Sequence, residues 1–126
     1  MKIKRTIITA ILLSISMSSY AFASSYSDCY SEPLSNLNNG SKVAGFWRVK
    51  KGAYCESTFR VGTKGETTRP IEIVSAPKEC KVITNKMAVA ITCNKIGEYN
   101  LVYRWHKKDS GIDGYVEIRR NLTVFE

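Results

Sequence analysis

Gly97-Glu98-Tyr99-Asn100-Leu101-Val102-Tyr103-Arg104-Trp105-His106 is the stretch of sequence that decides the fold. Aromatic or aliphatic side chains occupy every second position from Tyr99 to Trp105, which is typical of a β-strand with one buried face. A run of turn-forming residues, 108–114, follows, and a second alternating run covers residues 115–125. The pattern predicts two long antiparallel strands joined by a loop at 108–114.

Shorter runs of the same kind precede this pair, separated by Gly, Pro and Asn residues at intervals of 8 to 12 residues. These runs cover residues 43–50, 53–61, 71–74, 79–84 and 87–93. Trp47 is expected in the core, because tryptophan buries a large area in a small sandwich. The sequence therefore predicts an all-β fold, an immunoglobulin-like sandwich of about seven antiparallel strands. Residues 24–42 are expected to form an irregular N-terminal lead-in, with room for one helical turn near 33–38.

The N-terminal residues have the features of a bacterial secretory signal peptide. Three positive charges in residues 1–5 precede a short apolar run, 7–13, and the small-x-small site Ala21-Phe22-Ala23. We expect cleavage after Ala23, which leaves residues 24–126 as a single domain in the periplasm or secreted from the cell. The alternative is an uncleaved membrane anchor, but the apolar run is shorter than the roughly 20 residues that span a bilayer.

The four cysteines all follow the expected cleavage site, and an even number in an exported chain indicates two disulfide bonds. Three pairings are possible. We favour Cys80–Cys93, which flanks a predicted hairpin, together with Cys29–Cys55, which would tie the lead-in to a strand. A metal site is not expected, because no C-x-x-C spacing occurs and His106 is the only histidine.

The net charge is +8, and it falls to +5 when the basic residues of segment 1–23 are removed. This value is compatible with an anionic partner, and it is also common among ordinary secreted proteins. We expect no nucleic-acid partner and no cofactor.

The C-terminal third resembles the closing hairpin of bacterial immunoglobulin-like modules of the PKD and hyalin-repeat type. The resemblance rests on Gly97-Glu98-Tyr99-Asn100-Leu101-Val102-Tyr103, on Asp109-Ser110-Gly111 and on Arg120-Asn121-Leu122-Thr123-Val124, about 30 residues in all. It implies an immunoglobulin-like fold in which the hydroxyl of Tyr99 returns to the chain as a tyrosine corner. Such modules bind many kinds of partner, so the resemblance implies no particular function.

Residues 101–105, Leu-Val-Tyr-Arg-Trp, followed by a hairpin, are also similar to the third loop of chagasin-like cysteine-protease inhibitors. The N-P-T-T-G motif of that family is absent, and Asn38-Asn39-Gly40 is a poor substitute. The central glycine-rich motif is missing as well.

An enzyme is not predicted. His106 would have to act as the base, yet no G-x-S-x-G nucleophile motif is present and the cysteines are expected to be paired. We expect His106 to face solvent at the end of a strand. Asp109 and Asp113 raise the alternative of a calcium loop, although Asp and Gly are also the residues that a hairpin turn requires.

The outward face of the last two strands is the best candidate for a binding surface, because arginine and tyrosine are typical interface anchors. Arg120 has the same parity as Leu122, so either a bulge turns it outward or its stem is partly buried. The candidate residues are Arg104, His106, Lys107, Lys108, Tyr115, Arg119 and Arg120.

These features lead to one main hypothesis and two alternatives. The main hypothesis is a small exported, non-enzymatic binding module of the inhibitor or immunity type, with a protein partner in the envelope or outside the cell. The first alternative is a basic surface or coat protein that binds an anionic glycolipid or polysaccharide. The second alternative is a chagasin-like protease inhibitor.

Overall fold

The computed structural model describes residues 28–59 and 66–126. The chain divides into two compact units, Met1–Tyr30 and Ser31–Glu126. Only residues 28–30 of the first unit are described, and strand β2 (Cys29–Ser31) crosses the boundary between the units. The expected signal peptide, residues 1–23, lies outside the described residues and stays a prediction. Where the chain is described, no helix has the length and apolar character needed to cross a membrane.

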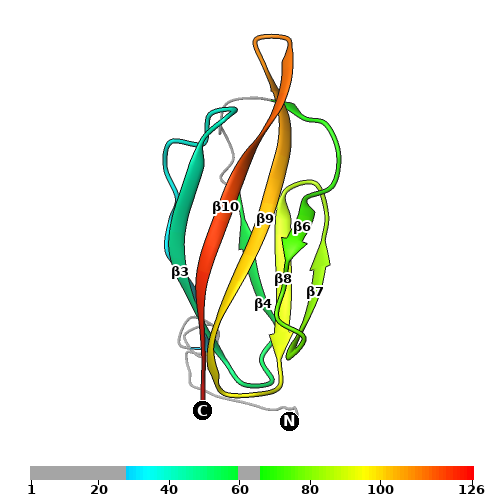
Figure 1. Ribbon diagram of the computed structural model, residues 1–126. Coiled ribbons are helices and arrows are strands. Elements are labelled where there is room, and N and C mark those ends of the chain that lie inside the picture. The colour runs from blue at the N-terminus through cyan, green and yellow to red at the C-terminus, as the bar shows by residue number, and fades with distance from the viewer. Residues whose placement is uncertain (1–27, 60–65) are drawn as a thin grey trace, which may run out of the picture. The chain divides into compact units, whose positions relative to one another are not determined.

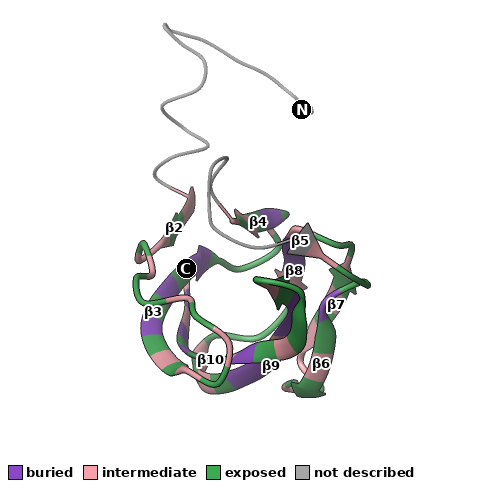
Figure 2. Ribbon diagram, turned by 90° about the horizontal axis from the view of Figure 1, so that it is seen from above, coloured by how far each residue is buried: buried purple, intermediate pink, exposed green. Residues whose placement is uncertain are grey.

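The second unit is a sandwich of two β-sheets (Figure 1). In the first sheet β10 (Ile112–Phe125) lies between β3 (Lys42–Lys50) and β9 (Gly97–Asp109), and β9 also pairs with β5 (Glu66–Thr67) and β6 (Glu72–Ser75). In the second sheet β8 (Ala88–Cys93) lies between β4 (Cys55–Thr58) and β7 (Cys80–Thr84). Figure 2 shows the two sheets facing each other across buried stretches of chain. The predicted all-β sandwich is confirmed.

One strand pair differs from the prediction of a purely antiparallel fold. Strand β3 runs parallel to β10, with Val43 opposite Ile118 and Trp47 opposite Leu122. The alternation of apolar and polar residues shows which face of a strand is buried, but it carries no information about the direction of the neighbouring strand. The sequence therefore predicted the strand at 43–50 but not its orientation.

The core is built on the inner face of β9. Leu101, Tyr103 and Trp105 are buried there as predicted, and the ring of Trp105 stacks on Phe59 with 4.0 Å between the ring centroids. The predicted tyrosine corner is also present: the hydroxyl of Tyr99 donates a hydrogen bond of 3.0 Å to the backbone carbonyl of Lys95. The indole of Trp47 is fully buried, in agreement with its expected place in the core.

The prediction of a loop at residues 108–114 is wrong. Strand β9 continues to Asp109 and β10 begins at Ile112, so only Ser110 and Gly111 form the turn. Both turn residues have positive φ angles, 51° and 79°, which a type I′ hairpin turn requires and which glycine adopts without strain. A two-residue turn of this type matches the twist of the flanking strands, so the strands pair to their ends.

The other predicted strand boundaries differ less from those in the structure. The run predicted at 53–61 contains β4 at Cys55–Thr58, and residues 60–61 lie outside the described part of the chain. Residues 33–38 form no helical turn, and the short strand β5 was not predicted.

The cysteines are oxidised, as expected. Cys80 and Cys93 are opposite each other in the β7–β8 hairpin and form one disulfide bond. Cys29 and Cys55 each take part in a disulfide bond as well, so none of the cysteines in the described residues is free. Two disulfide bonds are consistent with an oxidising compartment outside the cytoplasm.

Replacing Cys80 and Cys93 together with alanine is expected to lower the free energy of unfolding by about 2–3 kcal/mol, because the bond closes a short loop in the unfolded chain. Urea unfolding of the double variant and the parent protein measures the difference. A variant as stable as the parent would show that the β7–β8 pairing alone constrains this hairpin.

Candidate functional site

The outer face of β9 and β10 brings three of the predicted binding residues together. His106 lies directly opposite Tyr115 in the strand register, and Arg104 lies opposite Glu117. The rings of His106 and Tyr115 are tilted, with centroids 5.4 Å apart. Arg104, His106 and Tyr115 therefore form the centre of the predicted surface, which we call the β9–β10 face.

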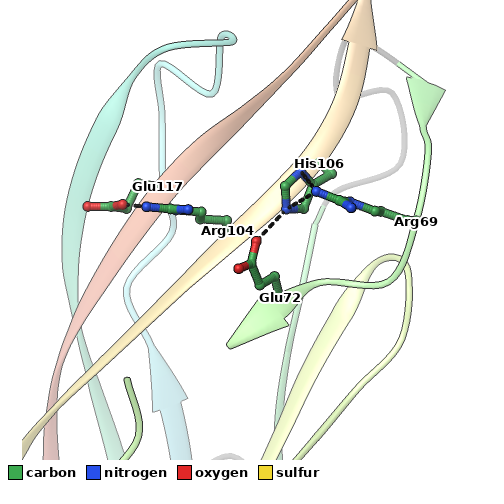
Figure 3. A network of polar contacts seen from close by, with 5 residues as sticks. All are labelled: Arg69, Glu72, Arg104, His106 and Glu117. Atoms are coloured by element: carbon green, nitrogen blue, oxygen red, sulfur yellow. Dashed lines mark hydrogen bonds and ion pairs between the residues drawn. The ribbon is translucent and has the colours of Figure 1, made fainter. Parts of the chain in front are cut away.

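His106 is not the solvent-facing residue that the sequence predicted. Only 7% of its surface is exposed, and its ring is held by side chains from a neighbouring segment (Figure 3). Nε2 lies 2.8 Å from Oε1 of Glu72, and Nδ1 lies 3.1 Å from Nη2 of Arg69. Nη2 of Arg69 also lies 3.2 Å from Nε2, so the guanidinium lies beside both ring nitrogens, and the short contact with Glu72 fits a proton on Nε2 that is donated to the carboxylate.

Glu72 lies opposite Arg104 in the β6–β9 pairing. Its hydrogen bond to His106 lowers the pKa of the Glu72 carboxyl below its ordinary value, and the positive charges of Arg104 and Arg69 act in the same direction. The carboxylate is thus held in its charged form by its surroundings.

Arg104 is paired on its other side as well. Its Nε lies 3.2 Å from Oε1 of Glu117, and its guanidinium is 4.6 Å from the centre of the Tyr115 ring. The hydrogen bond with Glu117 raises the pKa of Arg104 above its ordinary value. Arg104 and His106 are each matched by a carboxylate, so this face is a mixed-charge surface and not a cationic patch.

Lys107 does not belong to the surface at all, which corrects its assignment as a binding residue. Its side chain is 0% exposed, because its position has the same parity as Trp105 and points inward. The ammonium group lies 3.2 Å from Oδ1 of Asp109 and 4.9 Å from the centre of the Trp105 ring. This lysine supports the base of the hairpin.

Arg120 is also in the interior, with 2% of its surface exposed. The pairing of β10 with both neighbouring strands is continuous across this position, so no bulge turns the residue outward. Of the two possibilities that the parity left open, burial is the one that occurs, and it includes the guanidinium as well as the stem.

The remaining two candidates, Lys108 and Arg119, are exposed. Arg119 lies opposite Val102 on the outer side of β10, next to the β9–β10 face, and Lys108 lies close to the hairpin turn. Sequence reasoning missed Arg69 and Glu72, because the alternation within one strand does not show which residues of a short neighbouring strand will pair with it.

The tip of the β9–β10 hairpin extends beyond the other strands of the sandwich (Figure 1). Ile112 is 69% exposed there, the largest exposed fraction among the exposed large apolar side chains of the described residues. Asn39 holds both sides of the hairpin. Its backbone N–H donates to Oδ2 of Asp109 at 3.1 Å, and its side-chain amide donates to the carbonyls of Ile112 and Lys107 at 3.1 and 3.4 Å.

Asp109 and Asp113 do not form a cation site in this arrangement. Both carboxylate oxygens of Asp109 contact groups of the chain itself, namely Lys107 and Asn39. Across residues 28–59 and 66–126, no group of three or more His, Cys, Asp or Glu side chains is arranged to hold a metal ion. A wide, open hollow lies on the β9–β10 face, and its lining includes Arg69, Glu72, Arg104, His106 and Tyr115.

Comparisons with known proteins identify no family. No family model matches the chain, and no curated protein matches it. A solved structure described as PbICP-C in complex with falcipain-2 matches with a TM-score of 0.46 and 15% sequence identity, over 74% of this chain and 97% of that chain. A similarity of this extent does not assign a function, and the resemblance to PKD and hyalin-repeat modules stays a prediction.

Replacing Glu72 with glutamine is expected to destabilise the protein at neutral pH and to have little effect in acid. The pKa of Glu72 is lowered on folding, so the charged carboxylate stabilises the fold above its unfolded pKa, and this contribution is lost as the pH falls through the lower, folded value. Urea unfolding of Glu72→Gln and the parent protein from pH 7 to pH 3 measures the effect. A difference in stability that does not change with pH would contradict it.

Proposed function

We propose that this protein is a small non-enzymatic binding domain of the inhibitor type, which acts outside the cytoplasm on a protein partner. The observation that carries the proposal is the β9–β10 hairpin. It projects from the sandwich, is hydrogen-bonded to Asn39 at its base and exposes an isoleucine near its tip.

The rigidity of the hairpin has three sources. The turn has only two residues. The side-chain amide of Asn39 donates hydrogen bonds to backbone carbonyls on both strands. The buried Lys107 forms an ion pair with Asp109 at the end of β9. A preorganised loop loses little conformational entropy on binding, which raises the affinity available from a small contact area. An exposed isoleucine at such a position is suited to an apolar pocket of a partner.

A protein partner also fits the rest of this surface better than the alternatives do. The open hollow on the β9–β10 face does not enclose a small substrate. The mixed charges of the face suit a protein with matching charges. The coat-protein alternative is weakened, because Lys107 and Arg120 are buried while Arg104 is paired with Glu117.

The absence of enzymatic activity is part of the proposal. His106 contacts Arg69 and Glu72, neither of which carries a hydroxyl or thiol that a histidine base could activate, and the cysteines are in disulfide bonds. The histidine is therefore used to attach segment 69–72 to β9, a structural role.

The chagasin-like interpretation is the specific form of this proposal in which the partner is a cysteine protease. The hairpin is the part of the chain on which that interpretation rests. Trp105 does not contribute to such a contact, because it is buried against Phe59, and Asn39 has a structural role at the hairpin base. Any contact with a protease must come from the exposed residues near the turn.

The test uses the purified, disulfide-bonded protein as bait for proteins of the envelope and the culture medium, together with an inhibition assay on a papain-like protease. Replacing Ile112 with aspartate is expected to weaken binding by roughly 30-fold or more, because it places a charge in an apolar contact. Ile83→Asp is the matched control, since Ile83 is also exposed but lies on β7 of the other sheet.

Retention of one protein in a 1:1 complex that Ile112→Asp abolishes and Ile83→Asp preserves supports the proposal. If the protein inhibits the protease, and Ile112→Asp abolishes this inhibition while Ile83→Asp preserves it, the partner is a cysteine protease. Binding only to glycolipid or polysaccharide, with elution by moderate salt, would replace the proposal with the coat-protein alternative.

Replacing Asn39 with alanine is expected to loosen the hairpin without unfolding the sandwich. The change removes the two side-chain hydrogen bonds to the carbonyls of Ile112 and Lys107, and amide hydrogen exchange around residues 109–114 should accelerate by about tenfold or more. The exposed neighbour Asn38 provides the control variant, Asn38→Ala. Unchanged exchange in Asn39→Ala would show that the turn alone holds the hairpin.

A further inference from the structure

A cavity of about 210 Å³ lies in the second unit, away from the hairpin tip. The N-terminal segment 31–37 forms one wall, and residues 57–59, at the end of β4, form another. Tyr103 and Arg120 complete it from the first sheet. Each water molecule takes about 30 Å³ in the liquid, so the cavity has room for a small organic molecule.

Arg120 brings a positive charge to the wall of this cavity. Four of the five N–H groups of its guanidinium donate hydrogen bonds to other residues of the chain. Nε donates to the hydroxyl of Tyr103 at 3.1 Å, and one Nη2 proton donates to the hydroxyl of Ser57 at 3.1 Å. The Nη1 protons donate to the backbone carbonyls of Glu32 and Phe46 at 2.8 and 3.3 Å. All four acceptors are neutral.

Three further hydrogen-bond donors lie on Arg120 and on the residues around its guanidinium. The hydroxyls of Ser57 and Tyr103 accept from Arg120, so their own protons must point to a different acceptor. The second Nη2 proton of Arg120 is the third donor. Within the described part of the chain, no hydrogen bond is found in which any of these three groups donates its remaining proton.

No carboxylate neutralises the buried guanidinium at close range. Glu32 lines the cavity, but its Oε1 accepts a hydrogen bond of 3.0 Å from the backbone N–H of Phe46. Among the described residues, no Asp or Glu oxygen lies within 4.0 Å of an Arg120 nitrogen. A buried charge without a counter-ion is costly, and an anion placed beside it would offset much of that cost.

We propose that this cavity binds the carboxylate of a small molecule or of a peptide C-terminus. One guanidinium and two hydroxyls match a single negative charge, whereas a phosphate dianion would require more positive charge. The remaining walls include Pro33, Leu34, Leu37 and Phe59, which suit an apolar group attached to the carboxylate. The ligand class is therefore a monocarboxylate with a short apolar body.

This inference does not depend on the proposed function, because none of the cavity residues belongs to the hairpin tip. Loss of partner binding in Ile112→Asp leaves the cavity intact, and loss of carboxylate binding leaves the hairpin intact.

Titration of the isotope-labelled, disulfide-bonded protein with butanoate, followed by NMR chemical shifts, tests the proposal. Saturable shifts at residues 57–59, 103 and 120 are expected, with a dissociation constant in the millimolar range for so small a probe. Butanamide, which has the same shape without the charge, should produce no saturable shifts. The tripeptide Gly-Gly-Leu, compared with its C-terminal amide, distinguishes a peptide C-terminus from a free organic acid as the better source of the carboxylate.

Four variants test the donors. Arg120→Gln should abolish binding, Ser57→Ala should weaken it several-fold, and Glu32→Gln should tighten it by removing a nearby negative charge. Arg119→Gln changes the net charge by the same amount as Arg120→Gln at an exposed site and should leave binding unchanged. If Arg120→Gln fails to fold, the opposite effects of Ser57→Ala and Glu32→Gln still decide the question.

Three results would overturn the inference. The first is the absence of saturable shifts with butanoate and with Gly-Gly-Leu at concentrations up to about 50 mM. The second is equal binding of butanoate and butanamide, which would make the cavity a purely apolar site. The third is tighter binding of inorganic phosphate than of either carboxylate, which would assign the cavity to a different anion.

Discussion

The continuous pairing of β9 with β10 is the constraint on which the rest of the structure depends. It runs through thirteen residue pairs, from Gly97 opposite Val124 to Asp109 opposite Ile112. Because side chains alternate strictly along an unbroken strand, this pairing fixes the face on which every side chain of both strands lies. It sends His106 and Tyr115 to the outer face together. It also places Lys107 and Arg120 on the buried face, although each residue, judged by its type alone, would be expected to have its charge in water.

The two buried cations are accommodated in different ways. Lys107 has a carboxylate partner, Asp109, and lies over the indole ring of Trp105, so its charge is balanced within the hairpin. Arg120 instead bonds to hydroxyls and backbone carbonyls from four separate segments of the chain. Gly45 makes this possible, because a Cβ at that position would lie 3.0 Å from Nη1 of Arg120 and 2.8 Å from Leu34. Arg120 thus organises the chain around it, although no described carboxylate lies within 4.0 Å of its nitrogens.

The sequence predicted the features that depend on local alternation. The all-β sandwich, the inward face of β9 and the tyrosine corner of Tyr99 could all be predicted, because each follows from residues a few positions apart. The parallel pairing of β3, the partners of His106 and the length of the hairpin could not. These depend on contacts between distant segments: Glu72 reaches His106 from a strand 34 residues earlier, and Asn39 reaches Ile112 across 73 residues. The candidate site was predicted only in part, because charged residues were assigned to the surface on the basis of their type. Lys107 and Arg120 are charged but buried.

The N-terminal lead-in connects the hairpin and the cavity. Between Glu32 and Ser41 this segment belongs to no sheet, so its polar backbone groups depend on other partners. At one end the carbonyl of Glu32 accepts from Arg120, and at the other end Asn39 donates to both strands of the hairpin. A segment that is irregular in sequence is therefore held in place by a buried charge and by the hairpin base. The same ten residues thus contribute both a wall of the cavity and a support of the hairpin.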